Sequence, residues 1–173
     1  MNNHIVLKSK NIDINNINIC KNNNGNEIGN EIGNEICNVS NHALTYNNDY
    51  FMIQTPIIYD YELLNYNSKH YIELKLNMSK PTHVQFLTFI DSLELKLNNY
   101  NIKHNIKPIK TQIITNIQNN KSIKVKLLNN IVYYNLNKVE INELMNNKIS
   151  LLFKIEYNFN YYSLCAVQIL QLN

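Results

Sequence analysis

The side chains that most often carry out catalysis are present in this sequence but do not form a recognisable reactive set. The five histidines, at positions 4, 42, 70, 83 and 104, include no pair spaced two or four residues apart, as metal-binding histidines often are. All three glycines lie in one short repeat, which excludes a glycine-rich phosphate loop, and there is no GxSxG or HExxH motif. We therefore expect no enzyme activity, no metal ion and no cofactor.

Two pairs of carboxylates and one cysteine remain as candidates for catalysis. Asp91 and Glu94 fall on the outer face of an expected helix. Asp60 and Glu62 fall in an expected loop, and exposed acids at such places mostly serve solvation. Cys165 lies in an expected buried strand, where a thiol is ordinary core. The three cysteines have no CxxC spacing, so we expect reduced thiols rather than a disulfide or zinc site.

Lysines and tyrosines offer a more coherent chemistry. The segment from Lys96 to Lys138 contains eight lysines and no carboxylate, although the net charge of the chain is only +3. Single-stranded nucleic acid is held by a basic surface together with aromatic rings on which bases stack, each stack worth about 1–3 kcal/mol. The chain has 12 tyrosines to supply such rings. Our candidates for nucleic-acid binding are Tyr71, Lys75, Lys103, Lys107, Lys110, Lys124, Lys126 and Tyr133.

Simpler interpretations of the same residues compete with this one. A lysine-rich segment can be a solvated face, and tyrosines can fill a core with their hydroxyl groups at the surface. The chain has no arginine, the residue whose bidentate contacts to guanine most often read duplex sequence. Lysine, as a point charge, suits phosphate contacts that do not distinguish bases. Any binding is therefore expected to tolerate different sequences and to depend steeply on salt.

The length and composition of the chain indicate the kind of protein that carries these side chains. With 173 residues, 45% of them hydrophobic, the chain is long enough for one core, so we expect a single domain over residues 1–173. Asn and Ile dominate, with 36 and 25 copies, as AT-rich codons would produce. Residues 21–41 contain three copies of Gly-Asn-Glu-Ile, which we expect to form a mobile, dispensable surface loop. There is no signal-peptide layout and no apolar run near the roughly 18 residues of a membrane span, so we expect a soluble, intracellular protein without membrane contact.

Alternating apolar residues predict a half-buried β-sheet that positions the lysines and tyrosines. Lys75, Lys124 and Lys126 alternate with apolar residues that are expected to face the core, so we expect these lysines to point outward. The expected strands lie within 12–19, 50–54, 71–76, 123–127, 131–134, 149–157 and 161–170.

Two helices are expected to interrupt these strands. One runs from Pro81 to about Leu97, with Ser79 as N-cap and Pro81 in the first turn. A short second helix is expected over residues 138–146, with Glu140 completing a capping box. The order of elements predicts a mainly β fold, an antiparallel barrel or sandwich with two helices, and excludes a doubly wound parallel sheet.

Two stretches of the sequence resemble a known family. Residues 44–56 fit the pattern L-x-Y-x-x-x-x-ψ-x-[IV]-Q-T-P, where ψ is apolar, and residues 86–91 fit F-L-x-x-[IL]-D. With these two patterns the chain resembles a family of small proteins of nucleocytoplasmic large DNA viruses. Those proteins in turn resemble the OB-fold single-stranded-DNA-binding proteins of tailed phages. The resemblance spans residues from about Leu44 to the C-terminus.

The resemblance implies an OB-like β-barrel with a helix between strands and non-specific binding of single-stranded DNA during viral DNA replication or recombination. It places the protein in a virus-infected cell, in a viral factory, the cytoplasm or the nucleus. The codon bias suits a giant virus or an insect-infecting virus, and equally several protists. Viral replication proteins and a second copy of the chain are further candidate partners. The alternative is a structural or minor virion protein of the same fold class without affinity for nucleic acid. The lysines and tyrosines themselves fit RNA as well as DNA.

Overall fold

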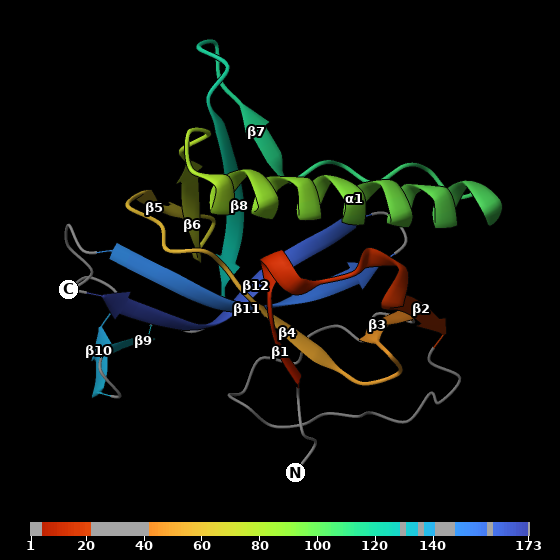
Figure 1. Ribbon diagram of the computed structural model, residues 1–173, viewed down its shortest axis with the longest axis horizontal. Coiled ribbons are helices and arrows are strands. Elements are labelled where there is room, and N and C mark those ends of the chain that lie inside the picture. Colours follow the sequence, from red (N-terminus) through yellow and green to blue (C-terminus); the bar gives the residue numbers. More distant parts are fainter. Residues whose placement is uncertain are drawn as a thin grey trace.

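The computed structural model describes residues 5–21, 42–128, 131–134, 137–140, 148–158 and 161–172. These residues form strands and one long helix, which lies on one side of the strands (Figure 1). The first strands are β1 (Ile5–Lys8), β2 (Ile17–Lys21), β3 (His42–Tyr46), β4 (Phe51–Gln54), β5 (Asp60–Tyr66) and β6 (Lys69–Leu76). After the helix α1 (Pro81–Lys103) come β7 (Ile113–Thr115), β8 (Lys121–Leu127), β9 (Ile131–Tyr134), β10 (Asn137–Glu140), β11 (Lys148–Asn158) and β12 (Tyr161–Leu172). Two 3-10 turns, η1 (Ser9–Asn11) and η2 (Ile14–Asn16), precede β2. The Gly-Asn-Glu-Ile repeat and Cys37 lie outside the described residues.

Ten of the described strands belong to one sheet. Its main order is β1-β4-β11-β12-β8-β6-β5, with β7 added to β8 and β9 joined to β12 and β10, whereas β2 and β3 pair separately. The pairs β1–β4, β12–β8 and β12–β9 are parallel and the other pairs are antiparallel. The mainly β fold is thus confirmed, and the sheet is mixed where we expected an antiparallel one. Alternation shows which face a strand buries, but not the direction in which its neighbours run.

One face of the sheet forms the core beneath α1. Ile72 and Leu74 of β6 and Ile123 and Val125 of β8 are fully buried on this face. The apolar side of α1 packs on them, and Figure 1 shows the helix running across that side of the sheet. The helix also contacts β11, where the rings of Phe86 and Phe153 meet edge to face at 6.1 Å. The apolar residues that alternate along the strands therefore pack against the apolar residues that recur at helical spacing along α1.

The beginning of α1 is fixed by a buried histidine rather than by a side-chain cap. Lys80, not Ser79, is the N-cap and makes no side-chain cap hydrogen bond, while Pro81 lies in the first turn as predicted. His83 Nδ1 accepts a hydrogen bond from Asn77 N at 3.0 Å, so Nε2 carries the proton and donates to Ile57 O at 2.9 Å. The ring thereby ties the helix to the segment after β4.

The end of α1 lies at Lys103, beyond the predicted end near Leu97. Asn101 is fully buried, and its Nδ2 donates to Lys107 O at 2.9 Å while its Oδ1 accepts from the Tyr157 hydroxyl. Asn98 Oδ1 accepts from Ile109 N at 2.8 Å. These amides hold the segment after the helix against its last turns, so polar residues extend the helix where periodicity had suggested an end.

Two local predictions fail because short strands with polar sequences lack a distinctive pattern. Residues 137–140, expected to begin a second helix, form β10, which pairs with β9 so that Val139 lies opposite Val132. The rest of that expected helix lies outside the described residues. Asp60 and Glu62, expected in a loop, belong to β5, a mostly exposed strand at the end of the sheet order. Over a few residues, backbone pairing with a neighbour outweighs intrinsic preference.

Glu94 is part of the fold and not a solvated acid. Its Oε1 accepts hydrogen bonds from Gln112 N at 2.8 Å, from Thr111 Oγ1 at 3.0 Å and from the Tyr162 hydroxyl. Burial, and next the bond to Glu94, raise the pKa of Tyr162. Glu94 therefore joins α1, the segment before β7, and β12.

Among the described residues, no helix is long and apolar enough to cross a membrane.

Replacing Glu94 with alanine should lower the free energy of unfolding by about 2–4 kcal/mol, because several hydrogen bonds are lost and the buried Tyr162 hydroxyl is left unpaired. Urea denaturation measures this. Glu94→Gln, which keeps an acceptor, should cost less. Leu95→Ala, at a neighbouring position that is 63% exposed, is the control and should change stability by only about 0.5 kcal/mol. Equal stability of Glu94→Ala and Leu95→Ala would contradict the assigned role.

Candidate nucleic-acid interface

The outer face of β6 and β8, the face turned away from α1, carries four of the predicted residues. The register places Tyr71 opposite Lys126, Glu73 opposite Lys124 and Lys75 opposite Ser122. Because Ile72 and Leu74 point into the core, these alternate residues point to the other side. We call this surface the β6–β8 face and define it by Tyr66, Tyr71, Glu73, Lys75, Lys124 and Lys126.

Lys124 lies close to two tyrosine rings on the β6–β8 face. Its Nζ is 4.4 Å from the ring centroid of Tyr71 and 6.0 Å from that of Tyr66. Tyr66, at the end of β5, is 65% exposed. A cation over a ring at an exposed site is worth about 0.5–1 kcal/mol, which is weak enough for a ligand to exchange with it. The arrangement thus puts a positive charge and two aromatic surfaces within reach of one bound molecule.

Carboxylates on or beside the β6–β8 face already have partners. Lys75 Nζ lies 3.7 Å from Asp60 Oδ1 and 3.8 Å from Glu62 Oε2. Glu73 Oε1 accepts a 2.5 Å hydrogen bond from Ser122 Oγ. In the part of the chain that the structure describes, neither Lys124 nor Lys126 forms an ion pair within 4.0 Å. The charge of Lys75 is therefore largely used within the protein, whereas those of Lys124 and Lys126 remain for a ligand.

Tyr66 was not among our selected residues, although a local signal for it exists. Asn67 and Ser68 have φ angles of 50° and 61° and connect β5 to β6. Two residues with positive φ are typical of a tight hairpin, and Asn favours the first of these positions. Had 67–68 been taken as a hairpin turn, Tyr66 would have been placed opposite Lys69, on the face of Tyr71.

The other predicted lysines lie on the helix side of the core. Lys103 ends α1, and Lys107 and Lys110 belong to the segment that Asn98 and Asn101 hold against the helix. Since α1 covers the core face of the sheet, these three lysines do not join the β6–β8 face. Tyr133 is on β9, where its backbone is in register with Leu170 of β12 and Lys138 of β10.

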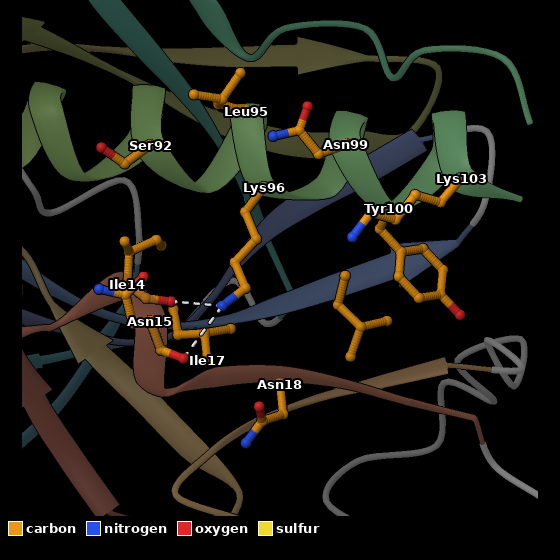
Figure 2. A pocket seen from close by; sticks show the side chains of 11 residues that line it. Ile14, Asn15, Ile17, Asn18, Ser92, Leu95, Lys96, Asn99, Tyr100 and Lys103 are labelled. Carbon is orange, nitrogen blue, oxygen red and sulfur yellow. Dashed lines mark hydrogen bonds between the residues drawn. The ribbon is translucent and has the colours of Figure 1, made fainter.

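A concave surface lies between α1 and the η2–β2 segment (Figure 2). It has a volume of about 480 Å³ and includes Lys103 and Tyr100 in its lining. Figure 2 shows the Lys96 ammonium pointing across it, where it donates to Ile14 O at 2.8 Å and to Asn15 O at 3.3 Å. Burial lowers the pKa of Lys96, and Asp13 partly offsets this effect. Lys96 thus anchors the N-terminal segment to the helix, which makes this groove a weaker site for a polyanion.

Cys165 borders the β6–β8 face but is not a reactive nucleophile. Its backbone is in register with Lys126 on one side and Lys154 on the other, and its side chain is fully buried. Burial, and next the negative charge of Glu156, raise the pKa of the thiol. Within the described ranges, no group of three or more His, Cys, Asp or Glu side chains is placed to hold a metal ion.

Comparison with known proteins identifies a structural relative. No family model matches the sequence, and no curated protein matches it. The fold is similar to the crystal structure of gp2.5, a single-stranded DNA binding protein encoded by bacteriophage T7, with a TM-score of 0.53 and 10% sequence identity. The match covers 69% of this chain and 85% of the phage protein. At this identity the likeness shows the fold alone, and it confirms the prediction of an OB-like, mainly β fold with a helix between strands.

The thiol of Cys165 should react slowly with a disulfide reagent such as Ellman's reagent in the native protein, because only a thiolate attacks and burial keeps this group protonated. A Cys20→Ser/Cys37→Ser variant leaves Cys165 as the single thiol. At pH 8 we expect its reaction to be more than about tenfold slower in buffer than in guanidinium chloride. Similar rates in both conditions would show an accessible, reactive cysteine.

Proposed function

We propose that this protein binds single-stranded DNA, without sequence preference and without catalysis, through the β6–β8 face. The observation that carries the proposal is that Lys124 Nζ lies within about 6 Å of the ring centroids of both Tyr71 and Tyr66. Bases of a flexible strand would stack on the two rings while its phosphates contact Lys124 and Lys126. The similarity to a phage single-stranded DNA binding protein supports the same function.

The chemistry of the β6–β8 face favours a single strand over a duplex. An aromatic ring can stack only on a base whose face is free, which a paired and stacked duplex does not offer along its length. The two rings together could contribute about 2–6 kcal/mol at the usual 1–3 kcal/mol per stack. Lysines add phosphate contacts that do not distinguish bases. Neither the stacking on the tyrosine rings nor the phosphate contacts of the lysines depends on the identity of the base, so binding should tolerate different sequences.

The biological setting belongs to the same proposal. Single-stranded DNA is exposed during DNA replication and recombination, and a protein that coats it without sequence preference would protect it at those stages. The sequence resemblance to proteins of nucleocytoplasmic large DNA viruses and the fold of a phage protein both support a viral role in infected cells. Viral replication proteins and a second copy of the chain remain proposed partners.

The test measures binding of fluorescent oligo-dT to the full chain by anisotropy at a series of salt concentrations. Lys124→Gln/Lys126→Gln should weaken binding and reduce the slope of log K against log salt by about 1.4, since each phosphate contact on a single strand contributes about 0.7. Lys107→Gln/Lys110→Gln removes the same charge from the helix side and should weaken binding less than Lys124→Gln/Lys126→Gln does. Tyr71→Leu should weaken binding by about 5- to 150-fold, the equivalent of one stacked base.

Two results would overturn the proposed function, and a third would overturn its location on the β6–β8 face. Failure of the wild-type protein to bind oligo-dT at low salt would favour the alternative of a structural or minor virion protein. Binding with no dependence on salt would be incompatible with phosphate contacts to lysine. If the Lys107/Lys110 variant loses more affinity than the Lys124/Lys126 variant, the interface lies on the helix side. Melting curves of all variants establish that each one is folded.

A further inference from the structure

A pocket of about 490 Å³ opens at one end of the β6–β8 face. Its walls come from the start of β5, the end of β6, the first residues of α1 and the β7–β8 hairpin, and Figure 1 shows that hairpin projecting past the helix. Tyr59, Lys80, Lys121 and Asn77 are among the residues that line it.

The pocket is continuous with the proposed binding surface. Glu73, Lys75 and Ser122 line it and also belong to the outer positions of β6 and β8. Lys75 lies four residues along β6 from Tyr71, which is about 13 Å at roughly 3.3 Å per residue. A strand of DNA that follows β6 and β8 from Tyr71 therefore leads to this pocket.

Tyr59 repeats the lysine–tyrosine arrangement of the β6–β8 face. Its ring is 52% exposed, and Lys80 Nζ lies 3.2 Å from the ring centroid. Lys148 Nζ lies 6.0 Å from the same centroid. One exposed ring therefore has two ammonium groups beside it, as Lys124 has two rings beside it.

The charges inside the pocket favour an anion. Asp60 is paired with Lys75, whereas Glu73 accepts from the neutral Ser122 and keeps its charge. The lining still has three lysines, Lys75, Lys80 and Lys121, against these two carboxylates. Lys121 Nζ donates to Thr115 Oγ1 at 2.7 Å, a neutral partner that leaves its charge in place. Lys80 and Lys121 thus remain as phosphate ligands on the two walls formed by α1 and the hairpin.

We propose that this pocket is a separate subsite that takes one nucleotide of the bound single strand, with its base on Tyr59 and its phosphate at Lys80 and Lys121. This inference rests on the proposed function. An incoming base displaces Lys80 from the ring onto the phosphate, an exchange favoured because base stacking on a ring is worth more than an exposed cation–π contact. Asn77 and Asn116 also line the pocket; their side-chain oxygens accept hydrogen bonds within the protein, and their amide nitrogens can donate to acceptors on a base edge.

A length series of oligo-dT at low salt separates this subsite from the main face. For the wild-type protein, affinity should rise as the oligonucleotide becomes long enough to reach from Tyr71 to Tyr59. Tyr59→Leu/Lys80→Gln should leave the affinity for the shortest binding oligonucleotide unchanged and lower that for longer ones by about 5- to 150-fold. The matched variant Tyr71→Leu/Lys124→Gln should lose affinity at every length. A 5-iododeoxyuridine at one end of a long oligonucleotide should crosslink to Tyr59 under ultraviolet light, which peptide mass spectrometry detects.

The outcomes distinguish failure of the subsite from failure of the function. If wild-type protein binds no oligonucleotide, the proposed function fails and the subsite with it. If the wild-type protein binds but Tyr59→Leu/Lys80→Gln binds every length equally well, the subsite alone is overturned. Equal loss at all lengths would also overturn it, because Tyr59 would then belong to the main face. Thermal unfolding of each variant confirms that the comparison is made on folded protein.

Discussion

Burial of one face of the sheet beneath α1 is the constraint on which the other features depend. Ile72, Leu74, Ile123 and Val125 are fully buried there, each worth about 1.5–3 kcal/mol relative to an exposed side chain. A shift of one residue in the register of β8 would turn Lys124 and its neighbours into this core, at the cost of desolvating their charges. The core therefore fixes which side chains occupy the β6–β8 face, although none of those side chains takes part in the core.

The same constraint explains what could be predicted from the sequence. Alternation and helical spacing report burial, so β6, β8, β9, β11, β12, the helix and the outward positions of Lys75, Lys124 and Lys126 could be predicted from the sequence. The edge strand β5 buries little, and its place was mistaken for a loop. The path of residues 104–112 depends on single hydrogen bonds to Glu94, Asn98 and Asn101, which have no period and leave no pattern to find.

Clustering of charge along the sequence proved a poor guide to clustering in space. The segment from Lys96 to Lys138 divides into an anchor, Lys96, a group on the helix side that includes Lys107, and the lysines of β8. The position of carboxylates matters as much as that of lysines. Lys75 shares the face of Lys124 but is held by Asp60 and Glu62, which come from a strand that sequence reasoning had missed.

Lysine and tyrosine together define what such a surface can recognise. An arginine in place of Lys124 could form bidentate contacts and discriminate guanine, whereas an ammonium over a ring makes no such distinction. The ring in turn accepts any unpaired base. When one such unit, Tyr71 with Lys124, lies on the β6–β8 face and another, Tyr59 with Lys80, lies in the pocket that adjoins it, the two together suit a ligand that is anionic, aromatic and flexible enough to touch both. A duplex meets the first of these conditions but buries its base faces, and a lone nucleotide cannot span the two units, which is why we propose single-stranded nucleic acid as the ligand.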